Sequence, residues 1–207
     1  MSMESFVVDT NFFFNLEIKS GFGDNPKQII IKFTQLAREL KNSKKAEFFM
    51  PPRIIEEFQT FVEPSVDYGK DFLSVITVKS PHTASIQFPA AVFYQLIDEI
   101  RERSYRGLRI AEESVDSGAQ KVMGAGELSK IDYQKKIGET VTKLRERYRQ
   151  ATRFNFLDSV ADLDLIVLSK EINAFLVSSD EGVLRWGREF GIKEVEPQAL
   201  LSRLEAL

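Results

Sequence analysis

Short apolar runs alternate with amphipathic stretches in the first part of the chain. Residues 5–9 and 46–50 are compact apolar runs rich in aromatic and β-branched side chains, which is typical of buried strands. The segment that begins at Asn25-Pro26 carries apolar residues at helical spacing, namely Ile29, Ile30, Phe33, Leu36, Ala37 and Leu40. A second helix is predicted after Pro51-Pro52. This order predicts a parallel sheet with crossover helices.

The same alternation returns towards the C-terminal end. Residues 163–168 read as an apolar helix, 174–178 as a strand, 183–187 as a helix and 191–195 as a short strand. Residues 71–78 fit a strand or a helix equally well, and both interpretations stay open. The fold class is therefore α/β, with a parallel sheet sandwiched by helices.

The middle of the chain carries two longer amphipathic stretches. Phe93, Leu96, Ile97, Ile100, Leu108, Ala111 and Val115 mark one amphipathic helix, and Ile137, Val141, Leu144, Tyr148 and Ala151 mark a second with near-heptad spacing. Gly124–Gly126 is the expected turn. We predict an inserted helical hairpin over residues 88–152, with residues 1–87 and 153–207 forming the α/β domain. Its apolar length exceeds what a small sheet can cover, so we expect it to project and to mediate self-association.

Composition limits the chemistry. The chain has 207 residues, 43% of them apolar and 29% charged, as in ordinary globular domains. It has no signal-peptide pattern and no apolar run of about 18 residues, so we expect a cytoplasmic protein that does not enter a membrane. There is no cysteine, and the single histidine, His82, lies in a loop-like segment beside Pro81. Thiol catalysis, histidine-paired hydrolysis and histidine-ligated zinc are thereby disfavoured.

Charge is unevenly distributed. The net charge is −3, yet residues 94–155 contain 13 Lys and Arg against 10 Asp and Glu, while the rest contains 15 against 21. A basic half that binds a polyanion beside an acidic catalytic half would show this asymmetry. Two solvated helix faces explain it equally well.

Acidic residues lie at the carboxyl ends of two of the predicted strands and near the start of a helix. Asp9 and Asp180 each lie at the carboxyl end of an apolar strand, so their side chains should reach the same edge of a parallel sheet. Asp158 and Asp162 are four residues apart, which places both on one helix face. Each aspartate could instead be a helix N-cap. Gathered carboxylates repel one another, however, so their convergence predicts a site for Mg²⁺ or Mn²⁺ with these four as ligands.

Two further acids are weaker candidates for the same site. Glu57 lies near the start of the helix after the second strand, whereas Glu56 is about 100° away around that helix and should face solvent. Asp164 is about 200° from Asp162 on a regular helix, so it joins the site only if the helix begins between them. Both Glu57 and Asp164 are retained as secondary catalytic candidates.

The acidic motifs resemble those of PIN-domain nucleases. They are Val7-Val8-Asp9-Thr10-Asn11, the segment Pro51 to Phe58, Asp162 with Leu165-Ile166, and Leu176-Val177-Ser178-Ser179-Asp180. The 18-residue step from Asp162 to Asp180 also fits that family's pattern.

Nearly the whole chain resembles a narrower group, the minimal protein-only ribonuclease P family. The matching segments are Arg106 to Glu113, Lys143 to Ala151, Asp158-x3-Asp162-x-Asp164 and Val177 to Gly182. The resemblance implies removal of 5′ leaders from precursor tRNA without an RNA subunit, dependence on Mg²⁺ or Mn²⁺, and a homo-oligomer assembled through the hairpin. The α/β domain would then be a PIN-like metallonuclease domain.

Without a second histidine for acid–base use of the ribose 2′-hydroxyl, attack by water is the favoured route to phosphodiester cleavage. The products would be a 3′-hydroxyl on the leader and a 5′-phosphate on the tRNA. For RNA binding we expect a stripe of cations on the hairpin, formed by Arg101, Arg106, Arg109, Lys143, Arg145, Arg147, Arg149 and Arg153. These side chains could instead pair with neighbouring glutamates.

Two alternative functions remain open from the sequence. One is a toxin-type or general PIN endoribonuclease that acts on another RNA, which the helical insertion disfavours. The other is a non-catalytic RNA-binding subunit, which the intact set of acids disfavours.

Overall fold

The computed structural model describes residues 3–63, 65–84, 86–153, 156–157 and 159–207. The chain divides into two compact units. The first combines residues 1–89 with 157–207, and the second consists of residues 90–156.

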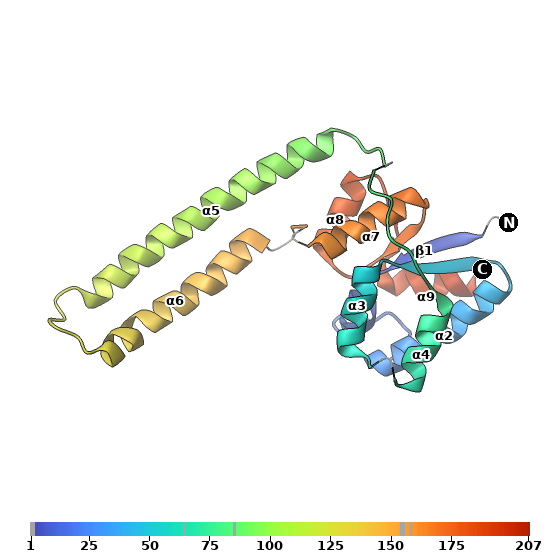
Figure 1. Cartoon of the computed structure of the whole chain (residues 1–207), viewed down its shortest axis with the longest axis horizontal. Helices are drawn as coiled ribbons and strands as arrows, with labels where there is room; N and C mark the ends of the chain where they lie inside the picture. Colours follow the sequence, from blue (N-terminus) through green and yellow to red (C-terminus); the bar gives the residue numbers. More distant parts are fainter. Residues whose placement is uncertain (1–2, 64, 85, 154–155, 158) are drawn as a thin grey trace. The chain divides into compact units, whose positions relative to one another are not determined.

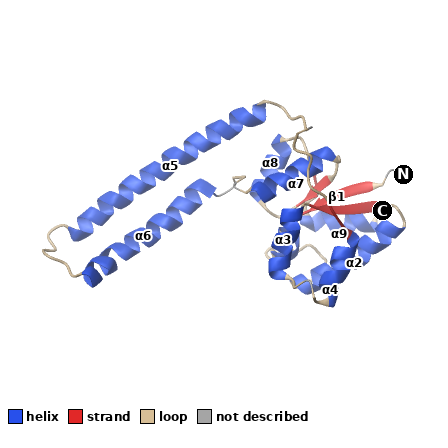
Figure 2. Cartoon of the chain, in the orientation of Figure 1, coloured by secondary structure: helices blue, strands red, loops and turns tan. Residues whose placement is uncertain are grey.

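A five-stranded parallel sheet forms the centre of the first unit (Figure 2). The strands are β1 (Glu4–Val8), β2 (Ala46–Met50), β3 (Ile76–Val78), β4 (Phe175–Val177) and β5 (Lys193–Glu194), in the spatial order β3-β2-β1-β4-β5. Every neighbouring pair is parallel. All carboxyl ends therefore lie at one edge, with β1 in the middle. The predicted α/β parallel-sheet class is confirmed.

Helices connect and flank these strands (Figure 1). They are α1 (Asn11–Phe14), α2 (Pro26–Asn42), α3 (Pro52–Phe61), α4 (Asp67–Val75), α7 (Val160–Glu171), α8 (Glu181–Glu189) and α9 (Pro197–Glu205). The ambiguous residues 71–78 contain both structures, because α4 ends at Val75 and β3 begins at the next residue. In the described parts of the chain, no helix is both long and apolar enough to cross a membrane.

A cluster of phenylalanines holds the N-terminal helices against β1 and β2. The Phe33 ring of α2 lies 5.2 Å from that of Phe13 and 5.1 Å from that of Phe48, between ring centroids. Phe58 of α3 stacks on Phe72 of α4 at 4.4 Å. Such aromatic pairs contribute about 0.5–1.5 kcal/mol each beyond their burial. This core therefore fixes the strand ends where the acidic residues follow.

The second unit is a pair of long helices, α5 (Ala91–Val122) and α6 (Lys130–Arg153), which lie side by side in Figure 1. Their closeness depends on small residues. A side chain at Gly107 of α5 would meet the Tyr148 ring of α6 at 2.8 Å. The helices are also tied by Arg103 of α5, which is buried and donates to the Thr152 carbonyl oxygen at 3.2 Å. The predicted hairpin is confirmed.

Candidate active site

Asp9 and Asp180 lie at the carboxyl ends of two neighbouring strands. Val8 of β1 is in register with Val177 of β4, and the Asp9 N–H donates to the Val177 carbonyl oxygen at 2.9 Å. Asp9 comes directly after β1, and Asp180 is three residues after β4. Both acids therefore occupy the edge where open parallel sheets bind their ligands.

The hydroxyl of Ser178 links these two acids. It donates to Oδ2 of Asp9 at 2.6 Å and accepts the backbone N–H of Asp180 at 3.0 Å. Ser178 is completely buried, so its single proton is committed to the Asp9 carboxylate. Sequence reasoning assigned Ser178 no role. The available signal was a hydroxyl residue directly after a buried strand and two positions before an acid.

Asp9 is a buried carboxylate, only 1% exposed. The backbone N–H of Asn11 donates to Oδ1 at 3.4 Å, and its side-chain amide donates to Oδ2 at 3.2 Å. Burial nevertheless raises the pKa of Asp9 above its ordinary value of 3.8, against the opposing effect of these donors and of Ser178. The nearby charge of Glu57 raises this pKa further. A cation placed here would offset both effects, so Asp9 is retained as a candidate ligand of a divalent metal.

This raised pKa predicts how metal-free stability depends on pH. Asp9 keeps its proton to higher pH in the folded chain than in the unfolded chain, so its contribution to stability falls as pH rises above 3.8 through the raised value. We expect the difference in unfolding free energy, wild type minus Asp9→Asn, to decline across that window. Urea unfolding in EDTA from about pH 4 to about pH 8 measures it.

Adding Mg²⁺ at neutral pH should then stabilise the wild type and leave Asp9→Asn unchanged, because the variant lacks the buried charge. A difference between wild type and Asp9→Asn that stays flat or rises with pH would contradict a raised pKa for Asp9.

Asp180 is held by the first turn of the helix that follows it. Its Oδ1 accepts the N–H groups of Gly182 at 2.7 Å and Val183 at 3.2 Å, so it is the N-cap of α8. The helix-cap alternative considered for this residue is thus true. Because both capping bonds fall on Oδ1, Oδ2 is oriented by the cap and available for a ligand.

Asp162 lies in the first turn of α7. The hydroxyl of Ser159 accepts its backbone N–H at 3.0 Å, so Ser159 supplies the N-cap of this helix. Asp162 itself is half-buried. Asp158 lies outside the described residues. Within the described residues, no three Asp, Glu or His side chains are grouped closely enough to hold a metal ion. The four-aspartate ligand set therefore stays a prediction.

The two secondary acids differ from each other. Glu57 is exposed on α3, and its charge is close enough to Asp9 to raise the pKa of that carboxyl. Asp164 is 7% exposed and its Oδ2 accepts from Nη1 of Arg53 at 2.5 Å. Asp164 was expected to join the site only if the helix began between Asp162 and Asp164. Helix α7 instead begins at Val160, before both residues, so Asp164 does not lie on the same helix face as Asp162. Sequence reasoning gave no role to Arg53.

The basic residues predicted to bind RNA are all exposed on α5 and α6. Three of them, Arg145, Arg149 and Arg153, line one groove of about 460 Å³ together with the Tyr148 ring. Arg147 instead donates to Glu113 at 2.6 Å, so the ion-pair alternative applies at this position. The second unit thus has a cationic groove with an aromatic wall.

Comparison with known proteins agrees with this site. Residues 5–207 match the family of PINc domain ribonucleases. Ribonucleases of this class generally use divalent metal ions. The fold and the acidic edge therefore define a PIN-domain ribonuclease.

The curated relatives narrow the class. An RNA-free ribonuclease P of Nitrosococcus oceani is 37% identical over 99% of this chain and 96% of its own length. Those of Thermodesulfovibrio yellowstonii and Pyrococcus horikoshii are 35% and 38% identical, over 93% and 94% of this chain and 89% and 88% of their own. The chain belongs to the RNA-free ribonuclease P family.

Proposed function

We propose that this protein removes the 5′ leader from precursor tRNA by metal-dependent hydrolysis and needs no RNA subunit. The observation that carries the proposal is the Asp9–Ser178–Asp180 link at the sheet edge, in a chain similar over nearly its full length to RNA-free ribonucleases P. Of the candidate functions considered for the sequence, only this one uses both the acidic edge and the helical insertion.

The protein's part in the reaction is to hold carboxylate oxygens in fixed directions. Ser178 and Asn11 orient Asp9, and the first turn of α8 orients Asp180 through Oδ1. These carboxylates would hold a divalent cation, which would supply charge neutralisation for the scissile phosphate and a more acidic water as the nucleophile. The exposed Glu57 of α3 is near enough for its charge to act on Asp9, which supports its secondary catalytic role.

We further propose Mg²⁺ as the cation, with Mn²⁺ as a substitute, and Asp9, Asp158, Asp162 and Asp180 as its ligands. The support is chemical: the candidate donors are carboxylates, and hard divalent cations prefer such oxygens. The expected place of action is the cytoplasm, where precursor tRNA would be met.

The direct test is incubation of the purified protein with a precursor tRNA and Mg²⁺, with the cut mapped to the nucleotide. One cut at the start of the mature tRNA, leaving a 5′-phosphate on the tRNA and a 3′-hydroxyl on the leader, is expected. Cleavage only elsewhere, or of unrelated RNA equally well, would indicate a general endoribonuclease. Tight binding without any cleavage would indicate a non-catalytic subunit.

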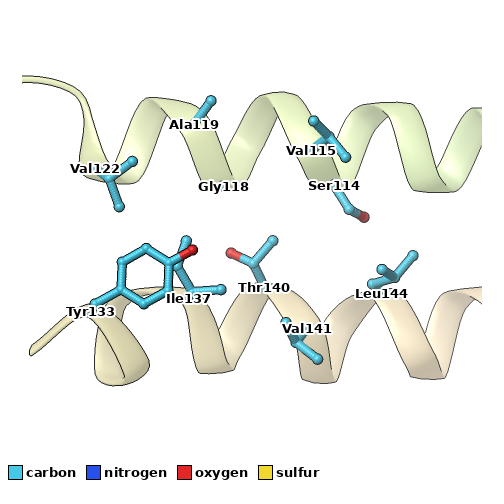
Figure 3. A pocket seen from close by; sticks show the side chains of 10 residues that line it. All are labelled: Ser114, Val115, Gly118, Ala119, Val122, Tyr133, Ile137, Thr140, Val141 and Leu144. Atoms are coloured by element: carbon cyan, nitrogen blue, oxygen red, sulfur yellow. The ribbon is translucent and has the colours of Figure 1, made fainter. Parts of the chain in front are cut away.

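The hairpin supports a proposal about self-association. An open apolar groove of about 310 Å³ runs between α5 and α6, lined among others by Val115, Val122, Tyr133 and Ile137 (Figure 3). Near the start of α5, the large apolar side chains Phe93, Tyr94, Ile97 and Ile100 are about half exposed or more. Apolar surface of this extent usually marks a protein–protein contact. We propose a homo-oligomer assembled through the hairpin.

Light scattering at micromolar concentration should therefore give at least a dimer. Replacing Ile97 and Ile100 by glutamate should shift the protein towards the monomer, because each change places a charge in the apolar contact. A monomeric wild type at that concentration would contradict the assembly, as would an oligomer that the double variant leaves intact.

A further inference from the structure

A polar pocket lies at the same sheet edge as the candidate active site. It encloses about 360 Å³ and is lined by Pro52, Arg53 and Glu56 of α3, Pro81 of the segment after β3, and Asp164 of α7. Helix α3 follows β2, the strand beside β1, and all these strands are parallel. Glu57, the next residue after Glu56, is near enough to act on Asp9. The pocket is therefore a neighbour of the acids.

Arg53 is held in this pocket by Asp164 and keeps donors for a ligand. Asp164 has a side chain only 10% exposed, whereas that of Arg53 is 55% exposed. A guanidinium has five N–H donors, and the bond to Asp164 uses Nη1. Within the described residues no other hydrogen bond of Arg53 is found. Asp164 thus fixes the direction of the guanidinium, and its outer donors face the solvent.

The charges of the pocket select the type of ligand. The carboxylates of Asp164 and Glu56 outnumber the one guanidinium, so a free phosphate is disfavoured. A nucleobase is neutral and offers acceptors to Arg53 and amino donors to Glu56. The rings of Pro52 and Pro81 supply apolar surface, and the hydroxyls of Ser80 and Thr83 add adaptable hydrogen-bonding groups. The volume is at the small end of ligand sites, which suits one base.

We propose that this pocket binds one unpaired nucleobase of the RNA substrate next to the scissile bond. Arg53 contacts the base, and Asp164 is a positioning residue for Arg53, not a metal ligand. The inference rests on the proposed function, because it places the base in the precursor tRNA that the enzyme cleaves.

The test is a series of precursor tRNAs, each with one base removed from the ribose at a different position around the cut. With the wild type, removal at one position should raise KM about tenfold, as expected when a single base no longer meets its side chains. With Arg53→Met the same removal should change KM less than twofold, because this variant cannot bind the base in any case. Arg38→Met, which breaks the exposed ion pair with Asp71 elsewhere on the domain, is the matched control and should respond like the wild type.

Asp164 needs a separate measurement. Asp164→Asn should lower base sensitivity as Arg53→Met does, yet leave the Mg²⁺ concentration for half-maximal rate within about twofold of wild type, since no ligand is removed. A tenfold higher Mg²⁺ requirement would overturn the positioning role. If either single variant unfolds, Arg53→Met/Asp164→Leu removes both charges and leaves no unpaired buried carboxylate.

The outcomes separate this inference from the proposed function. A wild type that never cuts precursor tRNA refutes the proposed function and the base pocket with it. A wild type that cuts correctly but tolerates removal of every base near the cut refutes the pocket alone.

Discussion

Asp162→Asn and Asp180→Asn should each lower the rate of leader removal by about 10²-fold or more while the protein stays folded. Each change keeps the size of the side chain and removes one metal-binding charge, and loss of one strong transition-state stabiliser typically has an effect of this order. At position 180 the fold should tolerate the change because asparagine caps a helix about as well as aspartate. Single-turnover cleavage at saturating Mg²⁺ measures the effect.

Asp67→Asn is the matched control. Asp67 is an exposed acid in the first turn of α4, as Asp162 is an acid in the first turn of α7, so the substitution removes an equivalent helix-terminal charge away from the site. It should cleave at the wild-type rate. Near-normal turnover in both site variants would refute the ligand assignment, and wild-type activity that persists in EDTA would refute metal-dependent hydrolysis altogether.

The fold could be predicted because its signals are local. The apolar run 46–50 is followed directly by a proline, which marks the end of β2. The apolar residues after Asn25 recur at the spacing of a single helix, which marks α2. Both elements could therefore be predicted from neighbouring residues alone. Helix α1 is four residues long, too short to show a period. Residues 71–78 stayed ambiguous because a helix and a strand meet within them, and a single pattern cannot describe both.

The candidate site could be predicted only in part. The strand ends placed Asp9 and Asp180 correctly, since the parallel order brings their backbones to one edge. The contacts that orient them depend on tertiary packing: Ser178 reaches Asp9 across 169 positions of sequence, and Arg53 reaches Asp164 across 111. No local pattern encodes such pairs.

The burial of Asp9 also affects the stability of the folded protein. Its burial and the nearby Glu57 both favour the protonated acid, which cannot bind a cation well. Donors from Asn11 and Ser178 oppose this. Together with the Thr10 hydroxyl, which donates to Oδ1 at 3.3 Å, they hold the carboxylate in one orientation. Ionising Asp9 in the folded protein therefore lowers stability, and a cation at this position would offset that effect.

Replacing Arg145 and Arg149 together by alanine should weaken precursor tRNA binding and lower the salt slope of binding by about two, one for each phosphate that is no longer neutralised. The two side chains are four residues apart on α6 and line the same groove beside Tyr148. Neither belongs to the unit that carries Asp9 and Asp180, so cleavage at saturating RNA should fall much less than affinity.

Lys135→Ala/Lys136→Ala is the control, because it removes two exposed cations from the same helix but outside the groove. It should lower the slope by less than one. Binding measured across a salt series, in Ca²⁺ to prevent cleavage, separates the cases. Equal slopes for the two double variants would mean that α6 attracts RNA only by its total charge. A groove variant that binds as tightly as wild type at every salt concentration would show that the arginines are surface cations, and RNA recognition would have to lie elsewhere on the chain.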